Sequence, residues 1–414
     1  MARRFFSALL PQRAKRAPQL SAGHVIRLGR RHLFEDLPRF FASLGGIVFA
    51  VQLVVVQLGI FFGFVHSSTL LIQESRADFW AAAKEMQYLE ITLPVPYSWI
   101  AKARAVDGVA AAEPIIIRSI VFENSNGTLD YGRVVGFDPN GTLVHLDDRP
   151  LGDLRAISQP GAFAADAAQL SSLGVSGIGA EGTIRTKKAR LVALVHDTQP
   201  IISPTFLYTS LRNAVLWSPV MIDEFVRDPF SSSFDVNSPL NFVLVKARPG
   251  VDLDALRSSL ERALPDSRVL TKTEMIDVTQ RYWVKRTNVG FILGLCAILG
   301  ILVGMVVVSQ ILYTSVNEHL REYGTLKALG ISDRLLYASI VWQAVVMGLI
   351  GFVPGLLLGL AVADYAQNAR GIAIEITPPI TLEVLGLAIA MCVVAAIFAV
   401  RRAMTIDPMI VFKA

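Results

Sequence analysis

The sequence predicts a membrane protein of the α-helical class, with four transmembrane helices and a large α+β extracytoplasmic domain inserted between helices 1 and 2. Hydrophobic residues make up 53% of the 414 residues and charged residues 18%, a balance too apolar for one soluble domain. Four apolar runs without Lys or Arg are each long enough to cross a bilayer, which takes about 20 helical residues. Residues 66–288 have an ordinary soluble composition and are expected to fold as a domain.

The first apolar run follows a basic segment. Residues 1–39 are expected to form a cytoplasmic basic tail with an interfacial helix at its end, and residues 40–65 form transmembrane helix 1. Arg3 and Arg4 precede a short apolar stretch, as in a twin-arginine signal, but Pro11 ends that stretch too early. We therefore interpret the first run as an uncleaved anchor.

The domain of residues 66–288 shows both helical and strand patterns. A helix over Ser75–Tyr88 is expected to leave the membrane as a stalk, because its apolar residues follow a helical spacing. Two segments, Ser98–Ile117 and Leu240–Leu270, combine a helix with strands, and the second contains a helix over Asp252–Leu264. Between them, β patterns cover Ser119–Glu123, Tyr131–Gly136 and Ile184–Val195, and the first two flank an Asn124–Gly127 turn. The segments predict an α+β subdomain with an inserted β-rich subdomain.

Three more spans follow the domain. The remaining boundaries are transmembrane helix 2 at 289–313, a cytoplasmic connection at 314–334, transmembrane helix 3 at 335–363, a short periplasmic loop at 364–379, transmembrane helix 4 at 380–400 and a cytoplasmic tail at 401–414. Pro354 lies inside the third span and should kink or interrupt that helix, because proline has no amide hydrogen to donate.

The basic residues predict the orientation of the spans. They flank the first and last runs on the sides of the two termini, at Arg27, Arg30, Arg31, Arg39, Arg401, Arg402 and Lys413. Because positive residues favour the cytoplasmic side, both termini are placed in the cytoplasm of a bacterial inner membrane. Lys285 and Arg286 fall on the outer side, but long loops are translocated largely regardless of charge. The same distribution favours membrane lipid over nucleic acid as the partner of the basic residues.

Motifs for catalysis, metal binding or cofactor binding are weak. No G-x-x-x-x-G-K-[ST] motif occurs, so any ATPase is expected on another chain, which would hold the ATP and Mg. Gly177–Gly182 matches G-x-G-x-x-G but is better explained as a flexible turn. His66, His145 and His196 lack metal-binding spacing and are expected to be ordinary hydrogen-bonding histidines. The chain is therefore expected to be non-catalytic and to hold no cofactor or metal.

Two groups of residues are candidates for a functional role. Small residues four apart allow close helix packing in lipid, at Gly290, Gly294, Gly300, Gly304, Gly351, Gly355 and Gly359. The connection between spans 2 and 3 has the pattern of a short amphipathic helix that Gly330 ends. A solvated turn with an interfacial helix explains that pattern equally well.

The connection also carries a family resemblance. His319–Gly330 (HLREYGTLKALG) resembles the signature of FtsX-like ABC transporter permeases, and Ile406–Lys413 resembles the D/E-P-x-x-x-[FL]-[RK] ending of the same family. The layout of one span, a large outer domain and three further spans is similar to that of the MacB-type permeases in the type VII ABC superfamily. Within this superfamily the sequence looks most like DevC.

The resemblance implies a role for the connection and a set of partners. It implies that a helix there couples the chain to an ABC ATP-binding subunit through Glu318, Arg321, Glu322, Tyr323, Leu326, Lys327, Leu329 and Gly330. It also implies a second permease copy in a homodimer, a porter-and-sabre periplasmic domain, a periplasmic membrane-fusion adaptor and an outer-membrane channel.

Two hypotheses about function follow. The first is an exporter permease that works by mechanotransmission and moves an amphipathic or lipidic substrate. The alternative is a transmembrane regulator that uses ATP-driven motion to activate a periplasmic enzyme without transport. The substrate itself cannot be deduced from the sequence.

Overall fold

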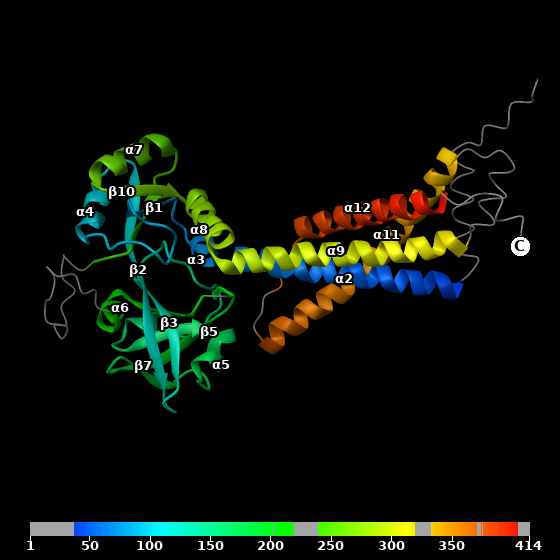
Figure 1. Cartoon of the computed structure of the whole chain (residues 1–414). Coiled ribbons are helices and arrows are strands. Elements are labelled where there is room, and N and C mark those ends of the chain that lie inside the picture. Colours follow the sequence, from blue (N-terminus) through cyan, green and yellow to red (C-terminus); the bar gives the residue numbers. More distant parts are fainter. Residues whose placement is uncertain are drawn as a thin grey trace, which may run out of the picture. The chain divides into compact units, whose positions relative to one another are not determined.

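The chain divides into two compact units. The computed structural model describes residues 37–201, 203–218, 239–318, 333–370, 374 and 376–404 (Figure 1). The first unit comprises Met1–Leu58, Cys296–Val362 and Ile376–Ala414, and the second comprises Gly59–Leu295 and Ala363–Glu375.

Among the described residues, four long helices have the length and hydropathy that a membrane crossing requires. They are α2 (Leu37–Ser67), α9 (Asn288–Glu318), α11 (Asp333–Arg370) and α12 (Pro378–Met404). Each contains one of the four apolar runs, so the prediction of four apolar helices is confirmed. The helix α11 continues through Pro354, and the third run is therefore one helix.

The second unit is built around one mixed sheet of ten strands. The strands are β1 (Phe79–Ala83), β2 (Val109–Asn124), β3 (Leu129–Phe137), β4 (Leu151–Gly152), β5 (Ala162–Asp166), β6 (Glu181–Ile184), β7 (Lys187–Val195), β8 (Thr205–Ser210), β9 (Phe242–Ala247) and β10 (Ser267–Thr271). Their order is β10-β1-β9-β2-β3-β8-β5-β7-β4, and β6 pairs with both β2 and β7. The pairs β3–β8 and β5–β7 are parallel.

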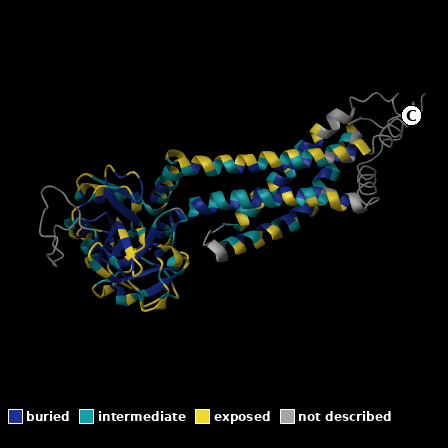
Figure 2. Cartoon of the chain, turned by 60° about the horizontal axis from the view of Figure 1, so that its bottom comes forward, coloured by how far each residue is buried: buried dark blue, intermediate teal, exposed yellow. Residues whose placement is uncertain are grey.

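Helices cover the sheet on both faces. They are α3 (Leu70–Glu74), α4 (Ser98–Arg104), α5 (Leu170–Leu173), α6 (Leu211–Trp217), α7 (Leu253–Ala263) and α8 (Lys272–Arg286), with the short 3₁₀ helices η1 (Leu154–Ser158) and η2 (Ala167–Gln169). Phe79 belongs to one hydrophobic cluster with Trp99 and Leu256, whereas Trp80 belongs to a second cluster with Met275. The interior of the sheet is consequently buried on both sides (Figure 2).

The prediction of a helix over Ser75–Tyr88 is wrong. Residues Phe79–Ala83 form the strand β1, which pairs with β10 on one side and β9 on the other. The Ala-rich sequence has a high helix propensity, but pairing with a strand on each side in a sheet that is buried on both faces overrides it. The helix that leads directly into a membrane-length helix is instead α8, which precedes α9.

Other expectations for this unit are confirmed. Asn124–Gly127 forms the turn of the β2–β3 hairpin, where Gly127 has a φ of 77°. The helix α7 begins after the capping residue Asp252 and lies between β9 and β10, as the pattern predicted. The 16-residue strand β2 pairs with β9 over Val109–Ile115 and with β3 over Ile115–Glu123, so the expected α+β and β-rich parts share one continuous sheet.

Candidate functional site

The expected coupling residues fall almost entirely outside the described part of the chain. Glu318 is the last residue of α9 and is exposed to solvent. The other seven lie outside the described residues: Arg321, Glu322, Tyr323, Leu326, Lys327, Leu329 and Gly330. The C-terminal segment Ile406–Lys413 lies outside them too, so the coupling helix stays a prediction.

Three of the expected packing glycines line the contact between α11 and α2. Gly351, Gly355 and Gly359 are buried, and a Cβ atom on each would lie within 2.8 Å of the side chains of Ile47, Val51 and Val55. Both series have a spacing of four residues, so one row of β-branched side chains fills one row of glycines. In lipid, where apolar side chains gain little from avoiding water, such close packing is a main source of helix association.

Two further glycines bring α9 close to its neighbours. A Cβ on Gly300 would lie 3.0 Å from Cγ of Gln57 in α2, and a Cβ on Gly304 would lie 2.6 Å from Cε of Met391 in α12. The four helices of the first unit therefore share one hydrophobic cluster that includes Val54, Val308, Ala344 and Ala388.

Gly290 and Gly294 behave differently from the other five glycines. A Cβ on Gly294 would meet only Cε2 of Phe61, at 3.9 Å, which is an ordinary contact. A Cβ on Gly290 would collide with the backbone carbonyl of Trp283 in its own chain. Thr287 is extended between α8 and α9, so Gly290 permits the chain to turn from one helix into the next.

The helix α8 starts with a complete capping box. The Glu274 amide donates to Oγ1 of Thr271 at 3.2 Å, and the Thr271 amide donates to Oε2 of Glu274 at 2.9 Å. Arg257 of α7 donates to Oε1 of Glu274 at 2.9 Å. Burial would raise the pKa of Glu274, but the hydrogen bonds from Thr271 and Arg257 and the charge of Arg257 outweigh it and lower the pKa.

The end of α8 contacts an aromatic cluster that the sequence analysis did not identify. The rings of Tyr282 and Tyr88 stack with their centroids 4.0 Å apart and their planes at 13°. Trp283 packs edge-to-face against Tyr88 and against Phe64 of α2, with centroid distances of 5.7 Å in both pairs. Burial of Tyr88, with Glu90 nearby, raises the pKa of its hydroxyl, so the ring stays neutral. The sequence signal that could have identified this cluster was the pair Tyr282 and Trp283 a few residues before the apolar run, because Tyr and Trp favour a membrane interface.

Two of the three histidines considered in the sequence analysis, His145 and His196, lie in one pocket. His145 and His196 line a cavity of about 380 Å³, together with Glu74 and three aspartates. Nε2 of His145 lies 3.2 Å from Asp148, and Nδ1 of His196 lies 3.0 Å from Asp147. Burial would raise the pKa of Asp147, but hydrogen bonds from the Arg149 amide and from His196 lower it. Within the described ranges, no group of three or more His, Cys, Asp or Glu side chains is placed to hold a metal ion.

Comparison with known proteins gives a family match for the C-terminal helices. Residues 294–408 match the FtsX-like permease C-terminal family. An uncharacterized ABC transporter permease of Methanocaldococcus jannaschii is 29% identical over 133 residues, which are 31% of this chain and 33% of that protein. An uncharacterized ABC transporter permease of Mycobacterium tuberculosis is 30% identical over 118 residues, which are 28% of this chain and 32% of that protein. The chain thus spans about one third of the length of these curated relatives.

Three other proteins cover a larger share of the chain at lower sequence identity. The pyoverdine export ATP-binding/permease protein PvdT of Pseudomonas syringae pv. tomato is 26% identical over 157 residues, which are 37% of this chain and 23% of that protein. The periplasmic region of MacB from Actinobacillus actinomycetemcomitans aligns with a TM-score of 0.33 and 11% identity, covering 50% of this chain and 94% of that structure. The extracellular domain of the transporter YknZ from Gram-positive bacteria aligns with a TM-score of 0.31 and 12% identity, covering 43% and 90%.

Proposed function

We propose that this chain, whose residues 294–408 match the FtsX-like permease C-terminal family, is the permease subunit of an ABC exporter. The match to this family is the observation that carries the proposal. The four membrane-length helices support it, since they provide a membrane-embedded subunit. The absence of a Walker A motif from the sequence also fits a permease that relies on a separate ABC ATP-binding subunit.

The ATP-binding subunit is expected to contact the segment between α9 and α11. Glu318 would lie at the start of this contact, and the residues up to Gly330 would form the rest of it. With both termini in the cytoplasm, this segment and the ATPase lie on the same side of a bacterial inner membrane.

We propose that the chain works by mechanotransmission. The helix α9 starts at Asn288, two residues after α8 ends at Arg286, so a displacement of α9 has a short path into α8. The helix α8 is in turn anchored to the sheet by β10, which ends at Thr271, and by the capping box at its first residues. Motion that starts at the ATPase is therefore transmitted to the ten-stranded sheet and its helices, named here the sheet domain, which we place outside the cytoplasm.

The substrate and the remaining partners complete the proposal. We propose an amphipathic or lipidic substrate, a homodimer of the permease, and a periplasmic membrane-fusion adaptor that leads to an outer-membrane channel. We infer them from the resemblance of the sequence to this family and, within it, to DevC. The outer domain acts on the substrate or adaptor without passing the substrate between the helices of the first unit.

Gentle purification of the chain from its native membrane, followed by mass spectrometry of the bound proteins, tests the proposal. Recovery of an ABC ATPase together with a periplasmic adaptor supports an exporter. Recovery of an ATPase with a cell-wall hydrolase would instead support a regulator of that enzyme. If no ATPase is recovered while other membrane complexes stay intact, the proposal is wrong.

A further inference from the structure

Residues 84–91 form a compact turn between β1 and α4, named here the linking turn. Its backbone is closed by hydrogen bonds, because the Gln87 amide donates to the Ile91 carbonyl at 3.0 Å and the Ile91 amide donates to the Tyr88 carbonyl at 3.1 Å. Met86, Tyr88 and Leu89 are buried, which fixes the turn against the domain. A turn held in this way moves largely as one body.

One side of the linking turn contacts the end of α8. The Tyr88 ring stacks on the Tyr282 ring, and Nη1 of Arg286 donates to Oε1 of Gln87 at 3.2 Å. Stacked aromatic pairs contribute beyond their buried area because the ring geometry is specific. A shift of α8 at Tyr282 therefore displaces Tyr88 or breaks the stack.

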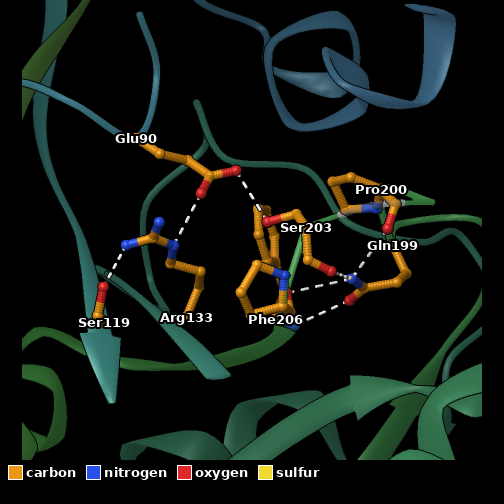
Figure 3. Close-up of polar contacts among 8 residues, drawn as sticks. Glu90, Ser119, Arg133, Gln199, Pro200, Ser203 and Phe206 are labelled. Atoms are coloured by element: carbon orange, nitrogen blue, oxygen red, sulfur yellow. Dashed lines mark hydrogen bonds and ion pairs between the residues drawn. The ribbon is translucent and has the colours of Figure 1, made fainter. Parts of the chain in front are cut away.

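The other side of the linking turn carries a nearly buried ion pair. Oε2 of Glu90 lies 2.7 Å from Nε of Arg133 in β3, and the two side chains are 6% and 19% exposed. Oγ of Ser203 donates to Oε1 of Glu90 at 2.8 Å, and Arg133 also donates to the hydroxyl of Ser119 in β2 (Figure 3). Both carboxylate oxygens are thus used by groups from two separate segments. Removing one partner of such a pair leaves the other charge poorly solvated.

The described residues before β8, which are 199–201, 203 and 204 and are named here the loop of residues 199–204, are held by hydrogen bonds. Nε2 of Gln199 donates to the carbonyls of Pro200, Ser203 and Pro204 at 3.0–3.2 Å, and the Phe206 amide donates to Oε1 of Gln199 at 2.8 Å (Figure 3). The Ile201 amide donates to Oγ of Ser67, the last residue of α2, at 3.2 Å. The loop leads directly into β8, which pairs with β3.

We propose that the linking turn couples α8 to β3 and to the loop of residues 199–204, with Glu90 as the residue that transmits the displacement. Tyr88 and Gln87 receive the motion of α8, and Glu90 passes it to Arg133 and Ser203. The purpose of this coupling in a transport cycle rests on the proposed function. The coupling itself is a property of this chain and is measurable without an ATPase.

Hydrogen exchange of the full chain in lipid nanodiscs tests the coupling. Tyr282→Ala removes the stacked ring and should speed exchange about tenfold in the linking turn and also at the Ile201 and Phe206 amides, a change equal to about 1.4 kcal/mol of opening free energy. Arg281→Ala is the matched control, because Arg281 is exposed and contacts Asp277 within its own helix. Faster exchange in the linking turn without any change at residues 199–206 would overturn the proposal.

Glu90→Gln gives a second test that does not depend on the stability of the Tyr282 variant. It should speed exchange at residues 199–206 and, because coupling is reciprocal, also at the end of α8. In the Glu90→Gln background, Tyr282→Ala should cause no further change at residues 199–206, since the path is already broken. Independent, additive effects of the two substitutions would contradict the role of Glu90. Neither result depends on whether an ATPase is recovered with the chain, so this inference and the proposed function can fail separately.

Discussion

Gly355 of α11 lies directly against Val51 of α2: a Cβ atom on the glycine would be 2.8 Å from both Cβ and Cγ1 of the valine. Real Cβ atoms do not approach other carbons so closely, so the contact requires a residue without a side chain. The same relationship joins Gly351 to Ile47 and Gly359 to Val55. The α2–α11 contact is consequently sensitive to any added side chain along this row.

Gly355→Val should destabilise the helices of the first unit by about 1–3 kcal/mol, because overpacking forces the two backbones apart. Thermal unfolding of the purified protein in detergent measures the effect as a lowered midpoint. Gly386→Val in α12 is the matched control, since a Cβ there would have no atom within 4 Å. Equal losses in both variants would contradict the packing role of Gly355.

Gly290→Ala should disturb the junction between α8 and α9. The added methyl group would collide with the Trp283 carbonyl, and the backbone on both sides of Thr287 would have to move. Trypsin should then cleave faster after Lys285 or Arg286, which limited proteolysis followed by mass spectrometry detects. Gly294→Ala should leave the cleavage rate unchanged, because its nearest contact is 3.9 Å away.

Glu274→Ala should weaken the start of α8 by about 1 kcal/mol at neutral pH, the usual contribution of a helix cap. Since the folded-state pKa of Glu274 lies below the unfolded value of about 4.3, its stabilisation is complete above that pH. It is lost as the pH falls through the lowered folded-state pKa. Hydrogen exchange of the Thr271 amide is measured in Glu274→Ala and in the unsubstituted protein from neutral to acidic pH. The difference between the two exchange rates should shrink as the pH falls. A constant difference over that range would exclude the charge as its source.

Asn213→Ala should be the most destabilising of these changes within the sheet domain. The buried Asn213 amide donates to the carbonyls of Ile157, Gln159 and Ala162, and its oxygen accepts from the Gly161 amide. Each buried group left without a partner costs about 1–3 kcal/mol. Chemical denaturation measures the loss, and Arg212→Ala at the exposed neighbouring position should have little effect. A loss no larger than that of Arg212→Ala would show that the amide contacts are dispensable.

Glu322→Lys and Leu326→Asp should uncouple ATP hydrolysis by the partner subunit from the function of the permease. The first reverses a charge and the second places a charge on the apolar edge of the expected coupling helix. The measurement is ATPase stimulation by the permease in reconstituted membranes, with membrane insertion checked in parallel. Normal stimulation and function in both variants would rule out this segment as the coupling contact.

The sequence by itself determined the four apolar helices and much of the local structure of the sheet domain. A long run of apolar residues without Lys or Arg predicts a helix without any tertiary information, because lipid requires the backbone groups to be paired within the helix. The turn at Asn124–Gly127 and the cap at Asp252 were predictable for a similar reason, since each depends on residues a few positions apart.

Only the tertiary structure decided which residues meet across the chain. The apolar residues of Ser75–Tyr88 follow a helical spacing and therefore predict a helix, whereas pairing with β9 and β10 makes Phe79–Ala83 a strand. The spacing of the glycines indicated close packing but did not identify Ile47, Val51 and Val55 as their neighbours. Glu90 and Arg133 are 43 positions apart by their numbers, and no local pattern connects them. Contacts of this kind arise from the path of the whole backbone, which a single sequence does not encode in any short segment.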